Sequence, residues 1–380
     1  MKIEKIFFTG FLIISLIDVL TSCKKDTPLT PEPNTEYVPT PYTIQIPKGY
    51  WPTQLNIPAN NPMTVEGVEL GRYLFYDGRL CGKTNDTLMS CGTCHQQAHS
   101  FENGIGYAHG VTGIQTPHVM LPFINLVFNN SGYLWNGKVE HNNPAYNTPT
   151  TYGGNIEDLC WMSVVAPHEF HSDTNHAREA IKNIAIYPPM FEKAFGSKEI
   201  TFKKISMAIA QFIRTLISSD SKFDKSLRGE AQLTSSELNG YDIFMTEKGD
   251  CFHCHGTILF TTNLFYNNAK DTTFLDPRDR YHVTYNPVDI GAYKAPTLRN
   301  IALTGPYMHD GRFATLDAVI NFYNEGLIWS PYVSPFMTHL NQGGDQLIQS
   351  DKDDLRAFLL TLTDSTFIHN PAFSKPADLP

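Results

Sequence analysis

The sequence predicts an all-α protein with two domains. Apolar residues recur with the spacing of a helix face in several segments, and no segment keeps the alternation of polar and apolar residues that marks a strand. The chain has 380 residues, which is enough for two domains of ordinary size. One pentapeptide pattern also occurs once in each half of the chain. Each half is therefore expected to carry the same kind of site.

Four segments show the helical pattern most clearly. Apolar residues share one face in each of them, and Ser or Thr residues stand where helix N-caps are expected. The expected helices are residues 202–217, residues 237–246 after a Thr234 or Ser235 cap, a helix between Thr315 and Gly326, and residues 352–362. The Gly-, Pro- and Asn-rich segments between the helices are expected to be long loops.

The repeated pattern is Cys-Xaa-Xaa-Cys-His, at Cys91–His95 and again at Cys251–His255. This spacing is typical of covalent attachment of a c-type haem, in which the cysteines bind the porphyrin and the histidine ligates the iron. The sequence therefore predicts two cytochrome c-like domains, each with one covalent haem. The attachment residues are Cys91, Cys94, Cys251 and Cys254, and the proximal iron ligands are His95 and His255.

A zinc site built from the two cysteine pairs is the alternative to haem. Zinc ribbons usually separate their cysteine pairs by roughly 15–20 residues. Here Cys91 and Cys251 are 160 positions apart, and a histidine follows each pair directly. The spacing favours two haems, so this chain is expected to handle electrons.

The N-terminus predicts export. Lys2 and Lys5 precede an apolar run that is too short to span a bilayer and suits a signal peptide over residues 1–22. The run ends in a sequence that resembles a bacterial lipobox, so Cys23 is expected to carry a lipid anchor. An ordinary signal peptide with an incidental cysteine is the alternative. We expect a periplasm-facing or cell-surface lipoprotein of a Gram-negative bacterium.

Composition suggests the remaining boundaries. Prolines recur among Thr and Glu in residues 23–56, which predicts an extended tether between the membrane and the folded body. The first haem domain is expected at 57–226 and the second at 227–370, with a tail at 371–380.

Two cysteines remain after the four thioethers and the lipid anchor. They are Cys81 and Cys160. In an oxidising compartment they could pair, and they could equally stay as two buried thiols. The sequence leaves both arrangements open.

The net charge of the chain limits the kinds of partner that it is expected to bind. The net charge is −9 and the pI is about 5.8, which argues against nucleic-acid binding because no basic stripe is present to neutralise phosphates. An acidic surface permits docking of a basic electron donor.

From residue 61 to residue 364 the chain resembles the bacterial di-haem cytochrome c peroxidase family, including its relatives that oxidise tryptophan residues of a partner protein. The matching segments follow the family's order, at residues 61–80, 124–138, 166–170, 212–227, 293–326 and 355–364. The resemblance implies a division of labour. A haem in the N-terminal half meets hydrogen peroxide, and a haem in the C-terminal half takes electrons from a donor.

Glu169 matches the family's catalytic glutamate. A carboxylate near the iron can move a proton from one peroxide oxygen to the other, provided that burial raises its pKa toward the working pH. A solvated loop glutamate, beside His168 and His171, is the alternative interpretation. The chain departs from the family ten residues earlier, where Leu159 stands in place of a frequent glutamine.

Two further residues of the first half match family positions. His109 stands near the position of a distal histidine that ligates the first haem in the resting enzyme, with His99 and His118 as competing candidates. Trp135 matches the tryptophan that lies between the haems and shortens the path for electrons. Its neighbours Asn136 and Lys138 replace an Asp and an Arg of the family motif, and Lys cannot reproduce the forked geometry of Arg.

The sixth ligand of the second haem has two candidates. Met308 offers a thioether sulfur, a ligand that raises the potential in cytochromes. Tyr323 falls on the family's axial position, where peroxidases have Met and the tryptophan-oxidising relatives have Tyr. Its ring lies on the apolar face of the expected helix, where a buried hydroxyl needs a partner. We favour Tyr323.

The resemblance also suggests a calcium ion between the haems. Its ligands would be carbonyl oxygens of Thr304 and Pro306 and one Asn side chain. The position of that Asn falls on Gln115 or Val119, so calcium occupancy is left open.

Together these features predict a di-haem peroxidase that reduces hydrogen peroxide with electrons from a small cytochrome c or cupredoxin. A high-valent di-haem oxidase acting on a protein or small molecule is the second interpretation, supported by Tyr323 and Leu159. A two-haem electron carrier without catalysis is the third. The lipid anchor would place the chain at a membrane, and a homodimer is possible.

Overall fold

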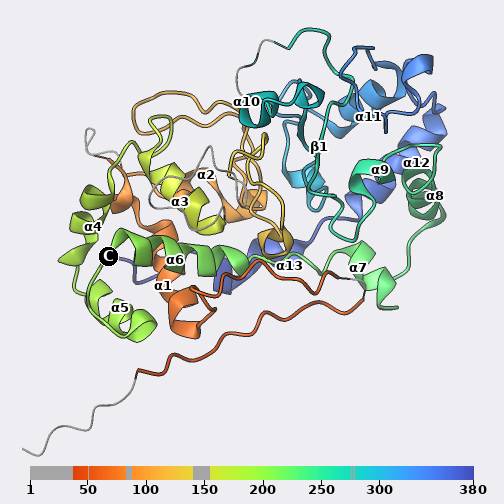
Figure 1. The fold of residues 1–380 in the computed structure, drawn as a ribbon. Helices are drawn as coiled ribbons and strands as arrows, with labels where there is room; N and C mark the ends of the chain where they lie inside the picture. The colour runs from red at the N-terminus through yellow and green to blue at the C-terminus, as the bar shows by residue number, and fades with distance from the viewer. Residues whose placement is uncertain (1–36, 50, 83–87, 140–154, 275, 277–278) are drawn as a thin grey trace, which may run out of the picture. The chain divides into compact units, whose positions relative to one another are not determined.

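The predicted all-α class is confirmed, because the chain folds into helices joined by long loops (Figure 1). The structure is a computed structural model that describes residues 37–49, 51–82, 88–139, 155–274, 276 and 279–380. The predicted signal peptide, the Cys23 lipidation site and the start of the tether lie outside the described residues. Residues from Val38 to Pro380 form one unit.

The described α-helices form two groups in the sequence, one up to α7 (Lys222–Leu227) and one after it. Those up to α7 are α1 (Val65–Tyr76), α2 (Cys91–Cys94), α3 (Ile156–Val165), α4 (Thr174–Lys182), α5 (Tyr187–Phe195), α6 (Phe202–Arg214) and α7 (Lys222–Leu227). Those after α7 are α8 (Ser235–Phe244), α9 (Phe252–His255), α10 (Tyr281–Thr284), α11 (Leu316–Glu325), α12 (Gln349–Leu360) and α13 (Ser365–His369).

Strands are minor in the part of the chain that the structure describes. β1 (Phe265–Tyr266) pairs antiparallel with β2 (Tyr293–Lys294), and the register places Phe265 opposite Lys294. None of the described helices is long and apolar enough to cross a membrane.

The four helices expected from the sequence are present, with differences at their ends. The Thr234 hydroxyl accepts from the Glu237 N–H and caps α8, and Thr315 caps α11 in the same way, with Gly326 at its end. α12 begins at Gln349, three residues before the predicted start, because its polar first turn carries no apolar residue that sequence periodicity could detect.

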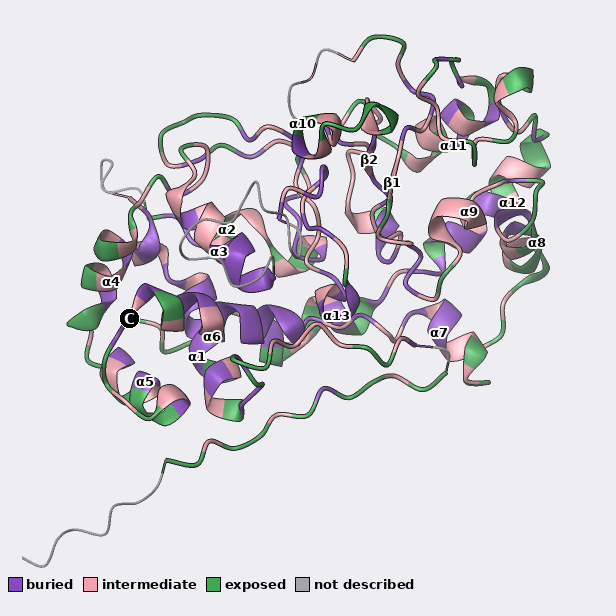
Figure 2. Ribbon diagram, viewed as in Figure 1, coloured by how far each residue is buried: buried purple, intermediate pink, exposed green. Residues whose placement is uncertain are grey.

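The first apolar core lies around α1, α3, α5 and α6. Figure 2 shows α6 buried along most of its length, and Leu74, Phe75 and Phe212 have no exposed surface. α1 and α6 approach closely at Gly71, where a Cβ would overlap the Ala208 carbonyl.

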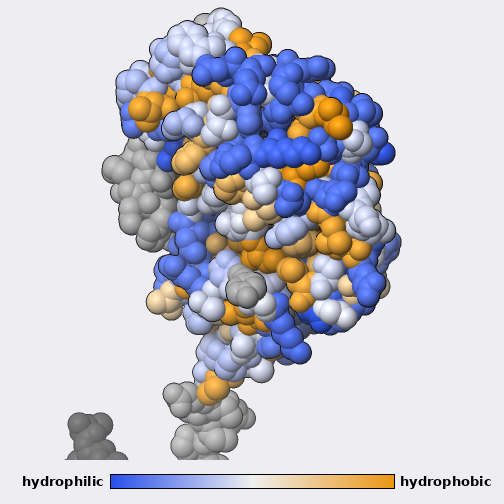
Figure 3. Space-filling view, turned by 90° about the vertical axis from the view of Figure 1, so that its right-hand side faces the viewer, coloured by the Kyte–Doolittle hydropathy of each residue, from blue (hydrophilic) through white to orange (hydrophobic). Residues whose placement is uncertain are grey.

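The second apolar core lies around α7, α8 and α12, and includes Phe223, Phe244 and Phe358. Its main helix pair, α8 and α12, also approaches closely at a glycine, as α1 and α6 do in the first core. A Cβ at Gly240 of α8 would overlap the carbonyl of Asp354 in α12. The outer face of this region mixes hydrophilic groups with separate apolar spots (Figure 3).

Each core encloses one buried ion pair. Arg214 of α6 binds Glu157 of α3 through two hydrogen bonds of 2.9 and 2.8 Å, and both side chains are at most 1% exposed. Arg299 binds Asp224 of α7 through two hydrogen bonds of 2.8 Å. Such pairs fix the relative position of the elements that carry them, because a lone buried charge is costly.

The two ends of the described chain pack on this body. Ile44 and Trp51 are buried with Phe128, so the second part of the predicted 23–56 tether lies against the protein. Phe367 of α13 and Phe373 join the first core. The predicted domain limits, 57–226 and 227–370, remain a prediction, and the C-terminal residues 371–380, expected to be a tail, begin in contact with the first core.

Candidate functional site

The first Cys-Xaa-Xaa-Cys-His motif forms a single helical turn. The His95 N–H donates to the Cys91 carbonyl at 2.8 Å, which turns both cysteines and the histidine around one short axis. The His95 ring donates its Nδ1–H to the Phe101 carbonyl at 2.7 Å. Nε2 is therefore the nitrogen left for a metal, and the carbonyl fixes the orientation of the ring.

The second motif has the same construction. The His255 N–H donates to the Cys251 carbonyl at 3.0 Å, and the ring Nδ1–H donates to the Phe260 carbonyl at 2.9 Å. Burial lowers the pKa of His95 to about 4 and also lowers the pKa of His255. Both imidazoles are consequently neutral near pH 7, as an iron ligand must be.

The four motif cysteines are thiols that remain available for thioether formation. None of them takes part in a disulfide, and burial raises the pKa of Cys91 to about 12 and that of Cys94 to about 11. Two thiols and one neutral imidazole nitrogen on each turn fit a c-type haem at both positions.

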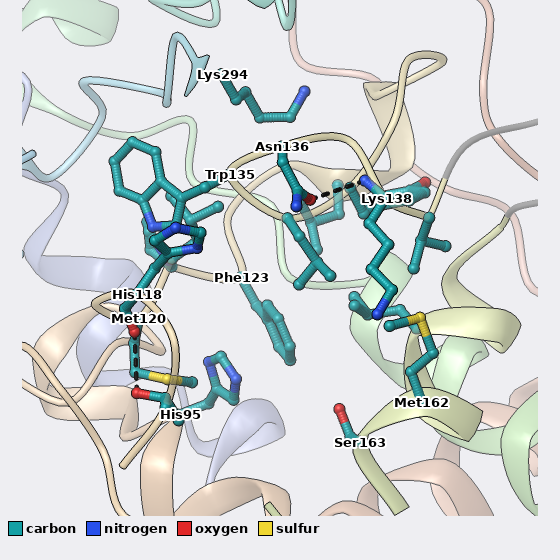
Figure 4. Close-up of a pocket in the computed structure, with 18 of the residues that line it drawn as sticks. His95, His118, Met120, Phe123, Trp135, Asn136, Lys138, Met162, Ser163 and Lys294 are labelled. Atoms are coloured by element: carbon teal, nitrogen blue, oxygen red, sulfur yellow. Dashed lines mark hydrogen bonds between the residues drawn. The ribbon is translucent and has the colours of Figure 1, made fainter. Parts of the chain in front are cut away.

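A cavity of about 790 Å³ adjoins His95 (Figure 4). Most of its lining is apolar, and a few polar groups reach into it. In Figure 4, Ser163 and Lys138 lie on one side of the cavity, with His95 and His118 on the other. The volume and the mixed lining are typical of a cofactor site. Other residues that line the cavity are Met120, Phe123, Trp135, Leu159, Met162 and Glu169.

Glu169 lies at this cavity, as predicted for the acid–base residue. It follows α3, and 32% of its side chain is accessible. Burial raises the pKa of Glu169, while a hydrogen bond from Ser163 and the charge of Lys138 lower it. The result is a carboxylate with a raised pKa beside the proximal histidine of the first haem site, which suits proton transfer.

His109 reaches the same region through a neighbouring loop. The Val111 N–H donates to the Glu169 carbonyl at 2.9 Å, which holds the His109 loop against the glutamate segment. A small cavity of about 40 Å³ is lined by His109, Glu169, His95 and both cysteines of the first motif. The structure thus brings His109 to the first haem site, and its role as a ligand stays a prediction.

Trp135 is buried between the two halves of the described chain. Its indole N–H donates to the Val119 carbonyl at 2.9 Å, and the Val119 N–H donates to the His309 carbonyl at 3.0 Å. The His309 ring stacks on Tyr293 with centroids 3.5 Å apart and meets Trp135 edge-on at 6.3 Å. A continuous aromatic group therefore connects the cavity with the loops of the second half.

Tyr323 and Met308 meet at one amide group. The Asn268 side chain donates to the Tyr323 hydroxyl at 3.1 Å and lies 3.6 Å from the Met308 sulfur. Burial raises the pKa of Tyr323, and the thiols of Cys254 and Cys251 are close enough to raise it further. The two candidate sixth ligands therefore lie together near the second motif, and whether either of them binds the iron stays a prediction.

The predicted calcium ligands lie in an apolar environment. Pro306 packs against Val119 in the narrow space between Gly106 and Gly311, and Val119 is only 5% exposed. Val119 offers no side-chain oxygen to calcium. Gln115, the other position that the sequence offers, carries an amide oxygen and lines the same cavity as Val119, so the calcium ion stays a prediction.

Sequence reasoning missed the residues that support these groups. Ser163 and Asn268 contact Glu169 and Tyr323 directly, and His309 lies in the aromatic group beside Trp135. Ser163 stands one helical turn after Leu159 in α3, so helix geometry could have identified it. No local signal marks Asn268, because 55 residues separate it from Tyr323.

The open question about the remaining cysteines has an answer in the structure. Cys81 and Cys160 are both buried, and no disulfide joins them. Cys160 instead lines the small cavity beside Cys91.

Comparison with known proteins supports a common origin with peroxidases. Residues 65–232 match the family model described as di-haem cytochrome c peroxidase. The methylamine utilization protein MauG of Methylorubrum extorquens is 30% identical over 82% of this chain and 82% of its own length. The cytochrome c551 peroxidase of Nitrosomonas europaea is 32% identical over 70% of this chain and 74% of its own.

A solved structure gives the same result for the fold. It is described as a MauG-like protein associated with microbial copper homeostasis, and it superposes with a TM-score of 0.76 at 31% identity. The match covers 88% of this chain and 99% of that chain. The motifs, the fold and these similarities agree, and they imply two c-type haems. The chain belongs to the di-haem cytochrome c peroxidase family.

Proposed function

We propose that this protein reduces hydrogen peroxide to water at the His95 haem site. The observation that carries the proposal is the position of Glu169, which lines the cavity next to His95 and has a raised pKa. The two-electron reduction of one peroxide consumes two protons and yields two waters. The site therefore needs a group that moves protons as well as a source of electrons.

The haem would be held by Cys91, Cys94 and His95, and when bound it supplies the redox chemistry that cleaves the O–O bond. Glu169 takes the proton from the inner peroxide oxygen and returns it to the outer oxygen, which leaves as water. Ser163 donates to the Glu169 carboxylate and orients it. Apolar side chains, including Leu159, line much of the same cavity and would limit the access of bulk water once the haem fills it.

Electrons would enter through the second haem site, held by Cys251, Cys254 and His255. Trp135 and the stacked rings of His309 and Tyr293 lie between the two halves and would provide an aromatic connection for the electrons. Tyr323 or Met308 would close the iron at this site. A closed iron suits electron transfer, because it leaves no position for peroxide.

The partners and the location belong to the same proposal. A small cytochrome c or cupredoxin would deliver electrons to the acidic surface. Lipidation at Cys23 would anchor the protein to a membrane of a Gram-negative cell, facing the periplasm or the cell surface. A homodimer and a calcium ion near Thr304 and Pro306 remain predictions.

Stopped-flow mixing of the reduced, haem-loaded protein with hydrogen peroxide tests the proposal. Rapid multiple turnover in the presence of a reduced small cytochrome c is expected. If both haems keep their spectra on mixing, peroxide does not reach iron, and the protein is a carrier without catalysis.

A di-haem oxidase acting on a protein or a small molecule is the second candidate. The observation that favours it is Tyr323, whose hydroxyl is positioned by Asn268 at the second haem site. It predicts that an oxidised species persists after peroxide is added and that a reduced cytochrome c consumes it slowly. The same mixing experiment separates the two activities.

A further inference from the structure

Three metal-ligating side chains meet beside the second Cys-Xaa-Xaa-Cys-His motif, outside the proposed peroxide site. They are Glu247, Asp250 and His253, and each offers one ligand atom within 4.8 Å of the other two. His253 Nε2 lies 3.1 Å from an Asp250 oxygen and 3.4 Å from a Glu247 oxygen. In the part of the chain that the structure describes, this is the one group of three such side chains.

Asp250 has an oxygen that no protein donor satisfies. Its Oδ2 accepts hydrogen bonds from the Thr338 N–H at 3.0 Å and the Thr338 hydroxyl at 2.9 Å, which fix the carboxylate. Its side chain is only 8% exposed. The other oxygen, Oδ1, is buried and accepts no hydrogen bond from any described residue. The hydrogen bond of His253 Nε2 is made with Glu247. A buried carboxylate oxygen without a donor is costly, and a cation would remove that cost.

The ring of His253 is also held in place. It stacks on Phe336 with centroids 5.5 Å apart and an angle of 24° between the planes, and it contacts Phe252 at 4.1 Å. The His339 ring contacts the Glu247 carbonyl at 2.6 Å and fixes the backbone of the third ligand. Two of the three ligands are thus oriented before any ion binds, which lowers the cost of ordering them.

From these contacts we propose that Glu247, Asp250 and His253 bind a divalent transition-metal ion such as Zn²⁺. One imidazole nitrogen and two carboxylate oxygens are ligands of zinc and of its neighbours in the first transition row. Bonds of about 2.0–2.2 Å from one ion would place ligand atoms about 3–4 Å apart. The two separations from His253 Nε2, 3.1 and 3.4 Å, already meet this requirement, and the two carboxylate oxygens lie within 4.8 Å of each other. The exposed Glu247 leaves the site open to solvent on one side.

The site has a direct electrostatic link to the second haem. His253 lies between the attachment cysteines Cys251 and Cys254 in the sequence, so a bound ion would lie at the edge of that haem. A nearby positive charge favours the reduced state of the iron and raises its potential. The ion would therefore tune the haem that receives electrons from the donor.

Zn²⁺ titration of the metal-free, haem-loaded protein by isothermal calorimetry tests the site. One equivalent is expected to bind to the unaltered protein. E247Q and H253Q should each weaken this binding by more than about tenfold. H253Q preserves both cysteines and the histidine of the motif, and haem staining verifies that both haems are attached. H282Q is the matched control, and it should leave the titration unchanged. His282 contacts Asp279 at 2.8 Å, and no third ligating side chain joins this pair among the residues that the structure describes.

A redox titration with and without Zn²⁺ gives an independent readout. The potential of one haem is expected to rise in the unaltered protein and in H282Q, and to stay constant in E247Q. Absence of stoichiometric binding, or binding that survives both E247Q and H253Q, overturns the proposal. Because binding is measured without peroxide, this outcome is independent of whether the protein proves to be a peroxidase.

Discussion

The two haem sites share one motif and differ in what surrounds it. At both, a helical turn presents two cysteines and a neutral histidine whose Nδ1–H is held by a backbone carbonyl. The first site opens into a cavity of about 790 Å³ that contains Glu169. At the second site the Tyr323 hydroxyl and the Met308 sulfur converge on Asn268.

The motif thus accounts for the cofactor, and segments far from it in the sequence supply the residues that distinguish the two sites. A haem held by the first motif would have the Glu169 carboxylate near it to move protons for peroxide. A haem held by the second motif would have Tyr323 or Met308 as a candidate ligand, which suits the passing of electrons. The supporting residues come from α3 at the first site and from α11 and two loops at the second.

The largest effect is expected from Glu169→Gln. The amide keeps the shape of the side chain but cannot accept and return a proton, so the rate of reaction with peroxide should fall by about 10²–10⁴-fold. Stopped-flow absorbance of the haems after mixing with peroxide measures this rate. The proximal ligands are unaltered, so the spectrum of the resting protein should change little.

Glu102→Gln is the matched control for that variant. Glu102 is 1% exposed, and burial raises its pKa to about 7, but it does not line the cavity. Its substitution should leave the peroxide rate within a few-fold of the starting value. An equal loss in both variants would show that any buried carboxylate near this haem matters, and the assignment of Glu169 would be wrong.

The next largest effect is expected on the free energy of unfolding, from removing either of the two buried ion pairs. Arg214→Leu and Arg299→Leu each leave one buried carboxylate without its partner, which should lower the free energy of unfolding by about 3–5 kcal/mol. Urea denaturation of the haem-loaded protein measures both. Because Glu157 starts the helix that carries Ser163, Arg214→Leu should also slow the peroxide reaction. Arg299→Leu should not, since Asp224 belongs to the second core. The opposite pattern would contradict the division between the two halves.

A smaller, spectroscopic effect should identify the sixth ligand of the second haem. Tyr323→Phe removes the hydroxyl and keeps the ring, and it should change the electron paramagnetic resonance signal of one oxidised haem while leaving the other untouched. Met308→Leu retains the bulk of the side chain and should leave both signals in place. If Met308→Leu alone changes a signal, the thioether is the ligand. The second haem would then have the His and Met ligands of an ordinary cytochrome c.

Some of these features could be predicted from the sequence and others could not. The two Cys-Xaa-Xaa-Cys-His motifs could be identified from spacing alone, and the structure places each of them on a short helix. Helix positions such as Thr315 to Gly326 follow from caps and periodicity. The contact of Asn268 with Tyr323 depends on loop packing across 55 residues, which no local pattern encodes. The burial of Trp51 in the expected tether likewise depends on an apolar surface that other segments supply.

The smallest expected effect is a change in the pKa of Glu169 when its hydrogen bond with Ser163 is removed. Burial raises the pKa of Glu169 above its usual value of 4.5, and the Ser163 hydrogen bond opposes that rise. The carboxylate must be ionised to accept the peroxide proton, so the rate should increase with pH through the raised pKa. Ser163→Ala removes an interaction that stabilises the ionised form, and the acid limb of the pH profile should therefore move to higher pH. Ser206→Ala makes the same substitution at a buried serine of α6 that does not line the cavity, and should leave the limb unmoved. A shift to lower pH in Ser163→Ala would mean that the serine stabilises the protonated acid instead. A pH profile that is flat in all three proteins would remove Glu169 from the rate-limiting proton transfer, and the contrast between the two haem sites would then depend on the cavity alone.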